Sequence, residues 1–401
     1  MVSNKGVDNN TLFASALIAT IAWHLTFGLI GATVSKFVYA ICIWLTIFLS
    51  LKYRRNTFYK QTTTAILIMA FTVSVALYIS IFYPDNLHVG NKWLSLFGNP
   101  FCLLTLLAPF FVYLSNMNNI LNYTKKYFIL YLIIGFPFAF ISPMGYSVLV
   151  WFVPLFFPYI NNIYRLLCLF LMGCCIYTGI FTEETSRTNL LLSIFCIINY
   201  IMVDIFIEKR RFLKIYCMVI IFLPMTYSII TLVDPSFSIF NIIFNWLSGH
   251  SADTQLITDT RSLLYSELSE DLSLNNSWLF GKGVDGHYYS FYFDNKNAAD
   301  SYYRIASEVT FLTLLLHGGI IYVIGYYYML IHTVFKTLKY GQSRFVISCA
   351  LMFSTWTFMT FISVFFGCSL LHLIFFSIVG CCSSKKWLSL NDNQINFLFR
   401  K

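Results

Sequence analysis

Several arginine side chains and one glutamate side chain in this sequence are placed where they could act on a charged substrate. Arg261 follows Thr258 and Asp259, either of which is a good N-cap residue, so a helix is predicted to begin there with Arg261 in its first turn. The unpaired N–H groups of a helix N-terminus and a planar guanidinium group both suit phosphate oxygens. Arg261 is therefore a candidate phosphate ligand. The alternatives are an exposed charge or an ion pair with Asp259.

Arg304 and Glu308 are a further candidate for the site. They lie four residues apart, where an apolar segment begins. A carboxylate at that position could take a proton from a hydroxyl group. The alternative is that Glu308 makes a favourable contact with a helix N-terminus and an ion pair with Arg304. Arg187 stands in a similar position, directly before the apolar segment 188–206.

Other chemistry has less support. Gly281–Gly286 contains Lys282 but not the Ser or Thr that follows Lys in a P-loop, so we interpret it as a turn with left-handed glycines. His250 and His287 lack the spacing of zinc ligands, so no metal site is expected. The 11 cysteines lie in apolar segments, which indicates packed thiols and no disulfide framework. The candidate substrate-binding residues of this polar part of the chain are Asp259, Lys282, His287 and Arg304.

The composition indicates a membrane protein. The chain has 401 residues, of which 58% are hydrophobic and 11% charged, whereas soluble domains carry about 25% charged residues. A membrane span needs roughly 20 apolar residues, and this chain has enough for about a dozen. The net charge of +9 is then explained by basic cytoplasmic loops and not by binding of nucleic acid.

The predicted fold is an all-α polytopic membrane protein with about 12 transmembrane helices, or 11 if one short segment does not span. Residues 1–232 form a bundle of about nine spans, 233–305 a large extracytoplasmic loop with short helices, 306–382 three further spans and 383–401 a cytoplasmic tail. The spans are predicted at 11–31, 34–51, 62–82, 97–115, 127–142, 145–160, 163–182, 188–206, 212–232, 306–335, 344–365 and 368–382.

The basic residues predict the orientation. If the N-terminus is cytoplasmic and the spans alternate, most of the 26 Lys and Arg residues fall on the cytoplasmic side, as the positive-inside rule requires. Both termini are then cytoplasmic, and the loop 233–305 lies outside. Within this loop, 237–247 is predicted to be a helix at the membrane interface or a short buried helix. A second helix of about 15 residues is predicted from Thr258 to near Asn275, because Leu264, Leu268 and Leu272 recur every four residues.

Three stretches resemble the superfamily of bacterial O-antigen and capsular polysaccharide polymerases and O-antigen ligases. The stretches are TSRTNLL at 185–191, DTRSLLY at 259–265 with LFGKGVDGHYYS at 279–290, and EVTFL at 308–312 with LHGGIIY at 316–322. The resemblance covers about residues 180–340. It implies a glycan linked to undecaprenyl diphosphate as substrate, with Arg187 and Arg261 on the diphosphate. The family commonly has a histidine near the end of the loop, which this sequence lacks, so Glu308 is the candidate catalytic base.

The resemblance implies a membrane glycosyltransferase of the bacterial inner membrane that polymerises carrier-linked repeat units of O-antigen, capsule or exopolysaccharide at the periplasmic face. The expected reaction inverts the sugar and needs no metal or other cofactor. The expected partners are the carrier-linked glycan, membrane lipid and a chain-length regulator protein. An O-antigen ligase, a flippase or transporter of lipid-linked oligosaccharide, and a membrane acyltransferase are the alternatives.

Overall fold

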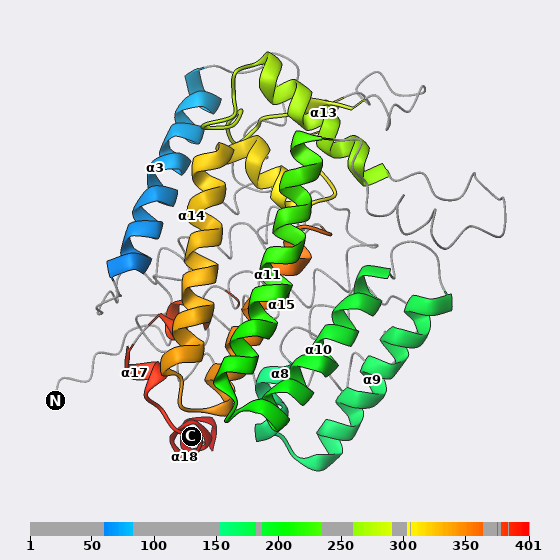
Figure 1. Cartoon of the computed structure of the whole chain (residues 1–401), viewed down its shortest axis with the longest axis vertical. Coiled ribbons are helices and arrows are strands. Elements are labelled where there is room, and N and C mark those ends of the chain that lie inside the picture. Colours follow the sequence, from blue (N-terminus) through cyan, green and yellow to red (C-terminus); the bar gives the residue numbers. More distant parts are fainter. Residues whose placement is uncertain are drawn as a thin grey trace, which may run out of the picture.

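The computed structural model describes residues 60–82, 153–181, 187–234, 260–290, 303–304, 306–363, 375, 378–383 and 385–400. Most of these residues lie in helices that stand side by side (Figure 1). The elements are α3 (Lys60–Phe82), α8 (Val153–Phe156), the 3-10 helix η2 (Phe157–Tyr159), α9 (Asn162–Phe181), α10 (Arg187–Phe206), α11 (Arg210–Val233), α13 (Thr260–Leu274), β1 (Tyr288–Tyr289), β2 (Tyr303–Arg304), α14 (Thr310–Tyr340), α15 (Arg344–Thr360), α17 (Lys385–Leu388) and α18 (Asp392–Arg400).

The core of the bundle is built around α15, which is buried along almost its whole length. Helices α10, α11 and α14 all pack against it. A chain of hydrogen bonds crosses this core: the Tyr216 hydroxyl donates to Asn199 Oδ1 (2.9 Å), and Asn199 Nδ2 donates to Thr355 Oγ1 (2.8 Å). Buried polar groups that are satisfied in this way favour one arrangement of the helices over others.

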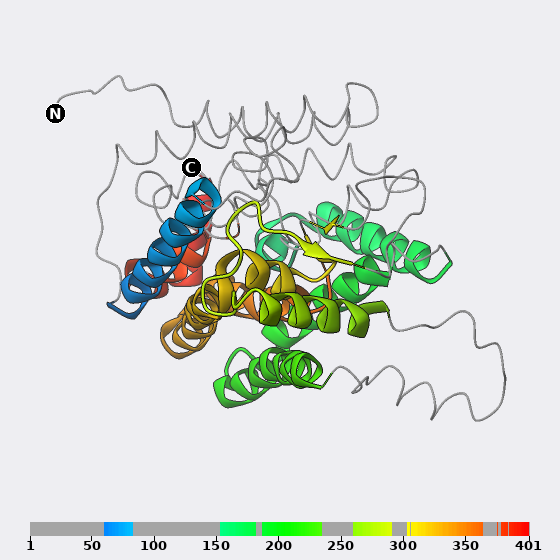
Figure 2. The same ribbon diagram turned by 90° about the horizontal axis from the view of Figure 1, so that it is seen from above.

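Apolar side chains also cover the outside of the bundle. On α11, which stands at the edge of the bundle in Figure 2, Ile215, Val219 and Leu223 are each more than half exposed. Such a wide exposed apolar face is unusual for a protein surrounded by water. Within the described residues, α11 and α14 are long and apolar enough to cross a membrane.

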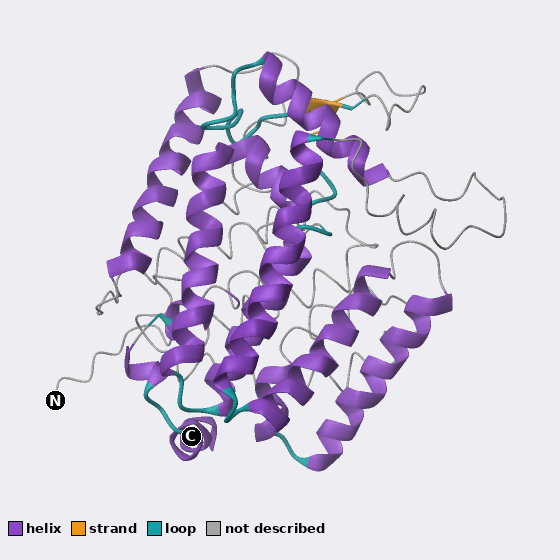
Figure 3. Cartoon of the chain, viewed as in Figure 1, coloured by secondary structure: helices purple, strands orange, loops and turns teal. Residues whose placement is uncertain are grey.

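Contacts between helix termini define two ends of the bundle. At the lower end in Figure 1, the Arg210 guanidinium at the start of α11 donates to the Gly341 carbonyl after α14 (3.1 Å). There too, Arg344 at the start of α15 pairs with Asp204 of α10 (3.0 Å). Helix α13 lies across the opposite end. We call the end with α13 and the strands the loop end, and the end with α17 and α18 the tail end (Figure 3). Helices α9, α10, α11, α14 and α15 run in alternate directions along the bundle, and α9 and α10 stop short of the loop end (Figure 1).

The described basic residues are divided unequally between the two ends. Those of the loop end stand in α13 and in the strands and turn beside it. They are Arg261, Lys282 and Arg304. Arg187 and Lys60 stand at the beginnings of α10 and α3, part-way between the two ends in Figure 1. Those of the tail end are Arg165, Lys209, Arg210, Arg211, Lys214, Lys336, Lys339, Arg344, Lys385, Lys386 and Arg400.

Helices occupy the segments where spans are predicted at 62–82, 163–182, 188–206, 212–232 and 344–365, although α15 ends at Thr360. Of the span predicted at 145–160, the described part holds only the short α8 and η2. The tail predicted at 383–401 folds into two helices, and Asp392 of α18 accepts a hydrogen bond from Tyr159 (2.8 Å).

The span predicted at 306–335 is not one straight helix. It begins at Thr310 and contains Gly319 with φ 68° and ψ −174°, a conformation outside the helical region. Residues before Gly319 form a short buried segment that crosses the loop end, and those after it form the long upright part of α14 (Figure 1). Glu308 precedes the helix instead of lying in its first turn. The spans predicted at 11–31, 34–51, 97–115 and 127–142, the interfacial helix at 237–247 and most of the span at 368–382 lie outside the described residues.

Candidate functional site at the loop end

Helix α13 is fixed to the bundle by one apolar side. Its bounds, Thr260–Leu274, confirm the helix predicted from the sequence, and Leu264, Leu268 and Leu272 are fully buried as their spacing predicts. Tyr265 stacks on Phe311 of α14 with ring centroids 6.3 Å apart, and its hydroxyl lies 2.8 Å from Ser228 Oγ of α11. These contacts bury the leucine side of α13, so the opposite side of the helix faces outward at the loop end.

The turn that follows α13 enters the break in α14. The backbone N–H of Ile320 donates to the Trp278 carbonyl (2.9 Å), and the Leu316 carbonyl accepts from the Lys282 N–H (2.7 Å). The turn residues thus form hydrogen bonds with backbone groups of α14 that would bond to each other in an unbroken helix. Non-helical backbone near the end of a membrane span is tolerated where protein buries it in this way.

Gly281 and Gly283 have φ values of 71° and 89°, which confirms the predicted left-handed turn. The Gly283 carbonyl lies 2.8 Å from Nδ1 of the buried His317, and the next backbone N–H, from Val284, donates to Ser80 Oγ of α3 (2.7 Å). The turn therefore joins α3, α13 and α14. Two of the three stretches that carry the family resemblance, 259–290 and 308–322, meet in this one unit.

Polar side chains gather beside α13 where β1 and β2 pair. In the antiparallel register Tyr288 lies opposite Arg304, so their side chains share a face. The Arg304 guanidinium pairs with the Glu308 carboxylate (3.4 Å), which is the contact expected under the alternative to a catalytic role for Glu308. From α13, Glu267 accepts a hydrogen bond from the Ser290 hydroxyl (2.7 Å). We call Glu267, Tyr288, Ser290, Arg304 and Glu308 the loop-end polar cluster.

Burial and charge give the members of this cluster different properties. Burial raises the pKa of the Tyr288 hydroxyl to about 12, although the positive charge of Arg304 acts in the opposite direction. Tyr288 therefore stays protonated at neutral pH. Among the described residues of the cluster, the carboxylates are then the proton acceptors, and Glu308, with a side chain 48% exposed, is more accessible than the half-buried Glu267. An accessible carboxylate beside a guanidinium group can bind a sugar hydroxyl and accept its proton.

Lys282 and His287 lie next to the cluster and make structural contacts. The Lys282 ammonium group is 2.7 Å from Asp271 of α13 and donates to the His287 carbonyl (2.8 Å). The His287 ring is buried and meets Tyr303 edge to face at 5.1 Å. These contacts tie the turn and β1 to α13. That Lys282 and His287 also bind substrate stays a prediction.

We expect Lys282→Met to destabilise the protein by about 3 kcal/mol, because it leaves the Asp271 carboxylate without its partner in a site that is mostly shielded from water. The two side chains are only 14% and 17% exposed. Thermal unfolding of the purified protein in detergent measures the loss. The double variant Lys282→Met, Asp271→Leu should recover most of it. Equal melting temperatures for Lys282→Met and the wild type would show that the ion pair contributes nothing.

The two arginines predicted to bind phosphate stand at the beginnings of two helices, α13 at the loop end and α10, which begins lower in Figure 1. Arg187 is the first described residue of α10, and Arg261 is the second described residue of α13. Figures 1 and 2 show the beginnings of α10 and α13 toward the same side of the bundle. Asp259 lies outside the described residues. Among the residues that the structure describes, no three His, Cys, Asp or Glu side chains are grouped to hold a metal ion.

Sequence reasoning missed Glu267, Tyr288 and Ser290 as members of this site. Each joins it through a contact between residues far apart in the chain: Glu267 and Ser290 are 23 positions apart. The repeat of leucines in α13 already indicates that Glu267 does not lie on the buried side, so Glu267 could have been proposed from the sequence. Comparison of the chain with protein-family models, curated proteins and solved structures finds no match.

Proposed function

We propose that this protein polymerises oligosaccharide repeat units linked to undecaprenyl diphosphate, by glycosyl transfer at the periplasmic face of the bacterial inner membrane. The loop-end polar cluster carries the proposal: an accessible carboxylate, Glu308, paired with Arg304 at 3.4 Å, beside a second carboxylate and a protonated tyrosine. A sugar presents many hydroxyl groups, and alternating donors and acceptors suit them. Arg261 lies at the same end of the bundle, and α10 begins with Arg187 on the same side of the bundle as the beginning of α13. The guanidinium groups of both residues suit a diphosphate.

Three features support a membrane location with the loop end outside. The outer face of α11 is apolar and exposed. The helices run in alternate directions, and basic residues are concentrated at the tail end. Lys and Arg residues are enriched on the cytoplasmic side of membrane proteins, so the tail end is assigned to the cytoplasm. About 12 spans complete the proposed architecture.

Cysteine labelling tests this orientation. In a variant without native cysteines, we expect a membrane-impermeant maleimide to label Glu270→Cys on α13 in spheroplasts. Glu208→Cys, between α10 and α11, should react only after the inner membrane is broken. Both side chains are exposed, so the membrane decides which of them the reagent reaches. Labelling of Glu208→Cys alone in intact spheroplasts would reverse the orientation.

The proposed reaction is an inverting displacement. A hydroxyl oxygen of the acceptor repeat unit attacks C1 of the sugar on the carrier, and the bond between C1 and the diphosphate oxygen breaks. The hydroxyl proton moves to the Glu308 carboxylate. The leaving diphosphate takes the electron pair of the broken bond, and Arg187 and Arg261 stabilise the charge that builds on its oxygens. Atoms and charge balance without a metal ion or cofactor.

Arg261→Lys should be nearly as damaging as Arg261→Ala. We expect either change to lower the polymerisation rate by about 10²–10³-fold, because a lysine keeps the charge but not the two parallel N–H groups that match diphosphate oxygens. Arg211→Ala is the matched control, since Arg211 is an exposed arginine at the start of α11. Rates are measured in membranes with equal protein levels. A wild-type rate for Arg261→Ala would remove Arg261 from the mechanism.

Deletion of the gene in its own host, provided that this host attaches long chains to its lipid A core, separates the candidate functions. Loss of a polymerase should leave lipid A core that carries one repeat unit and no long chains. Loss of a ligase would leave long chains on the carrier, and loss of a flippase would leave neither product on the periplasmic side. Normal long chains on the lipid A core, with no second copy of the gene, would overturn the proposal.

A further inference from the structure

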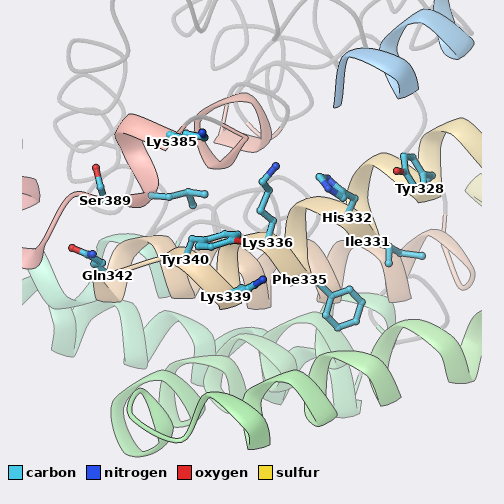
Figure 4. Close-up of a pocket in the computed structure, with 11 residues that line it drawn as sticks. Tyr328, Ile331, His332, Phe335, Lys336, Lys339, Tyr340, Gln342, Lys385 and Ser389 are labelled. Carbon is cyan, nitrogen blue, oxygen red and sulfur yellow. The ribbon is translucent and has the colours of Figure 1, made fainter. Parts of the chain in front are cut away.

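A cavity of about 890 Å³ opens at the tail end, between the last turns of α14 and the short helix α17 (Figure 4). Its size is within the range of small-molecule sites. The backbone N–H of Gln342 donates to the Leu388 carbonyl (3.1 Å), which fixes α17 beside the end of α14. The cavity is lined by Tyr328, Ile331, His332, Phe335, Lys336, Lys339, Tyr340, Gln342, Lys385, Leu388 and Ser389. We call it the tail-end pocket.

The lining combines positive charge with apolar walls. Lysines from two separate elements contribute to it: Lys336 and Lys339 from α14, and Lys385 from α17. Figure 4 shows Lys336 and His332 extending from α14 on the side where Lys385 lies. An anion bound in this pocket would lie near the positive charges of Lys336, Lys339 and Lys385. The described lining contains no Asp or Glu side chain.

Aromatic and aliphatic side chains make another part of the pocket apolar. Ile331 and Phe335 line it toward the middle of α14, away from the helix terminus. The Lys339 ammonium group lies over the Tyr340 ring at 4.9 Å, a cation–π contact that holds this lysine near the pocket. A ligand that fits both parts has a compact anionic group for the lysines and a hydrocarbon chain for the apolar wall.

We infer that the tail-end pocket binds the phosphate headgroup of an anionic membrane phospholipid, with its acyl chains along Ile331 and Phe335. Lysine acts as a compact positive charge with three donors, which suits a phosphate with several free oxygens. Basic pockets beside membrane spans on the cytoplasmic side bind such headgroups. This inference rests on the membrane location in the proposed function but is independent of polymerase activity. A free phosphate ester offers the same anionic group without the chains.

The test measures lipid binding directly. Wild-type protein is delipidated in detergent and titrated with phosphatidylglycerol, and the bound lipid is counted by native mass spectrometry. The pocket variant carries Lys336→Gln, Lys339→Gln and Lys385→Gln. The matched control carries Lys209→Gln, Arg211→Gln and Lys214→Gln, which removes the same charge at the start of α11 outside the pocket. Phosphatidylcholine and glycerol phosphate are the comparison ligands, and melting temperatures check that each variant is folded.

We expect the pocket variant to bind phosphatidylglycerol on the order of 100-fold more weakly than the wild type, from the loss of three lysine contacts. The control variant should bind like the wild type, and phosphatidylcholine should bind weakly to all three proteins. If the pocket and control variants lose the same affinity for phosphatidylglycerol, then the lipid is attracted by the overall positive charge of the tail end. That result would overturn the proposed site. Displacement of the lipid by glycerol phosphate would assign the pocket to a soluble ester and overturn the lipid. If the triple variant does not fold, Lys385→Gln alone should still weaken binding several-fold, and unchanged binding would overturn the site.

Discussion

Glu308→Gln should lower the rate of chain growth by about 10²–10⁴-fold, because glutamine keeps the shape of the side chain but cannot accept the proton of the acceptor hydroxyl. Binding of the carrier-linked substrate should change little, since the proposed diphosphate contacts come from arginines. The protein should also fold normally, because Glu308 precedes α14 and its side chain is 48% exposed. The measurement is the polymerisation rate in membranes at saturating substrate.

Two further variants separate Glu308 from its neighbours. Glu270→Gln is the matched control, since Glu270 is an exposed glutamate on α13 at the same end of the bundle, and it should leave the rate unchanged. Glu267→Gln tests the second carboxylate of the loop-end polar cluster. If Glu267→Gln abolishes transfer while Glu308→Gln retains most of the rate, then Glu267 is the base and the assignment of Glu308 is wrong.

Gly319→Ala should have the largest effect on folding. The φ of 68° and ψ of −174° belong to a region that is essentially restricted to glycine, and forcing another residue into it costs about 1–3 kcal/mol. A Cβ atom at this position would also overlap the backbone carbonyl of Leu279 and approach Phe280 N to 2.5 Å. The turn after α13 would have to leave the break in α14. We expect little folded protein, or a much lower melting temperature in detergent.

Gly173→Ala provides the comparison for this prediction. Gly173 lies within α9, and a Cβ atom there would meet nothing within 4 Å. Alanine in a helix interior should be neutral or stabilising by up to about 1 kcal/mol. If Gly319→Ala has the same yield and melting temperature as Gly173→Ala, the packing of the turn into the break of α14 does not contribute to stability.

Local patterns in the sequence predict the elements of the loop end well. The leucine repeat and the N-cap residues predict α13 almost to its bounds, because a stripe of one residue type at helical spacing requires one buried side. The glycine spacing predicts the left-handed turn at Gly281 and Gly283. The ion pair between Arg304 and Glu308 agrees with the alternative that their spacing allowed. Each of these features depends on residues within a few positions of one another.

Features that depend on distant residues were not predicted. The adjacent glycines at 318 and 319 give no sign that the turn at 278–283 supplies the hydrogen bonds that α14 gives up there. The ion pair between Lys282 and Asp271 gives Lys282 a structural contact that the sequence does not reveal. Tyr288 enters the candidate site because β1 pairs with β2. Such contacts form only when the chain folds back on itself, so they cannot be predicted from the spacing of residues along the sequence.

Synthesis by the purified protein tests the proposed function most directly. The protein is reconstituted in liposomes and supplied with one undecaprenyl-diphosphate-linked repeat unit as both donor and acceptor, without added metal. We predict a ladder of longer carrier-linked glycans and release of one undecaprenyl diphosphate for each bond formed, with both products reduced in parallel by Glu308→Gln. Folded wild-type protein that yields neither a ladder nor free undecaprenyl diphosphate, with the cognate repeat unit of its own host, would contradict the proposed polymerase activity.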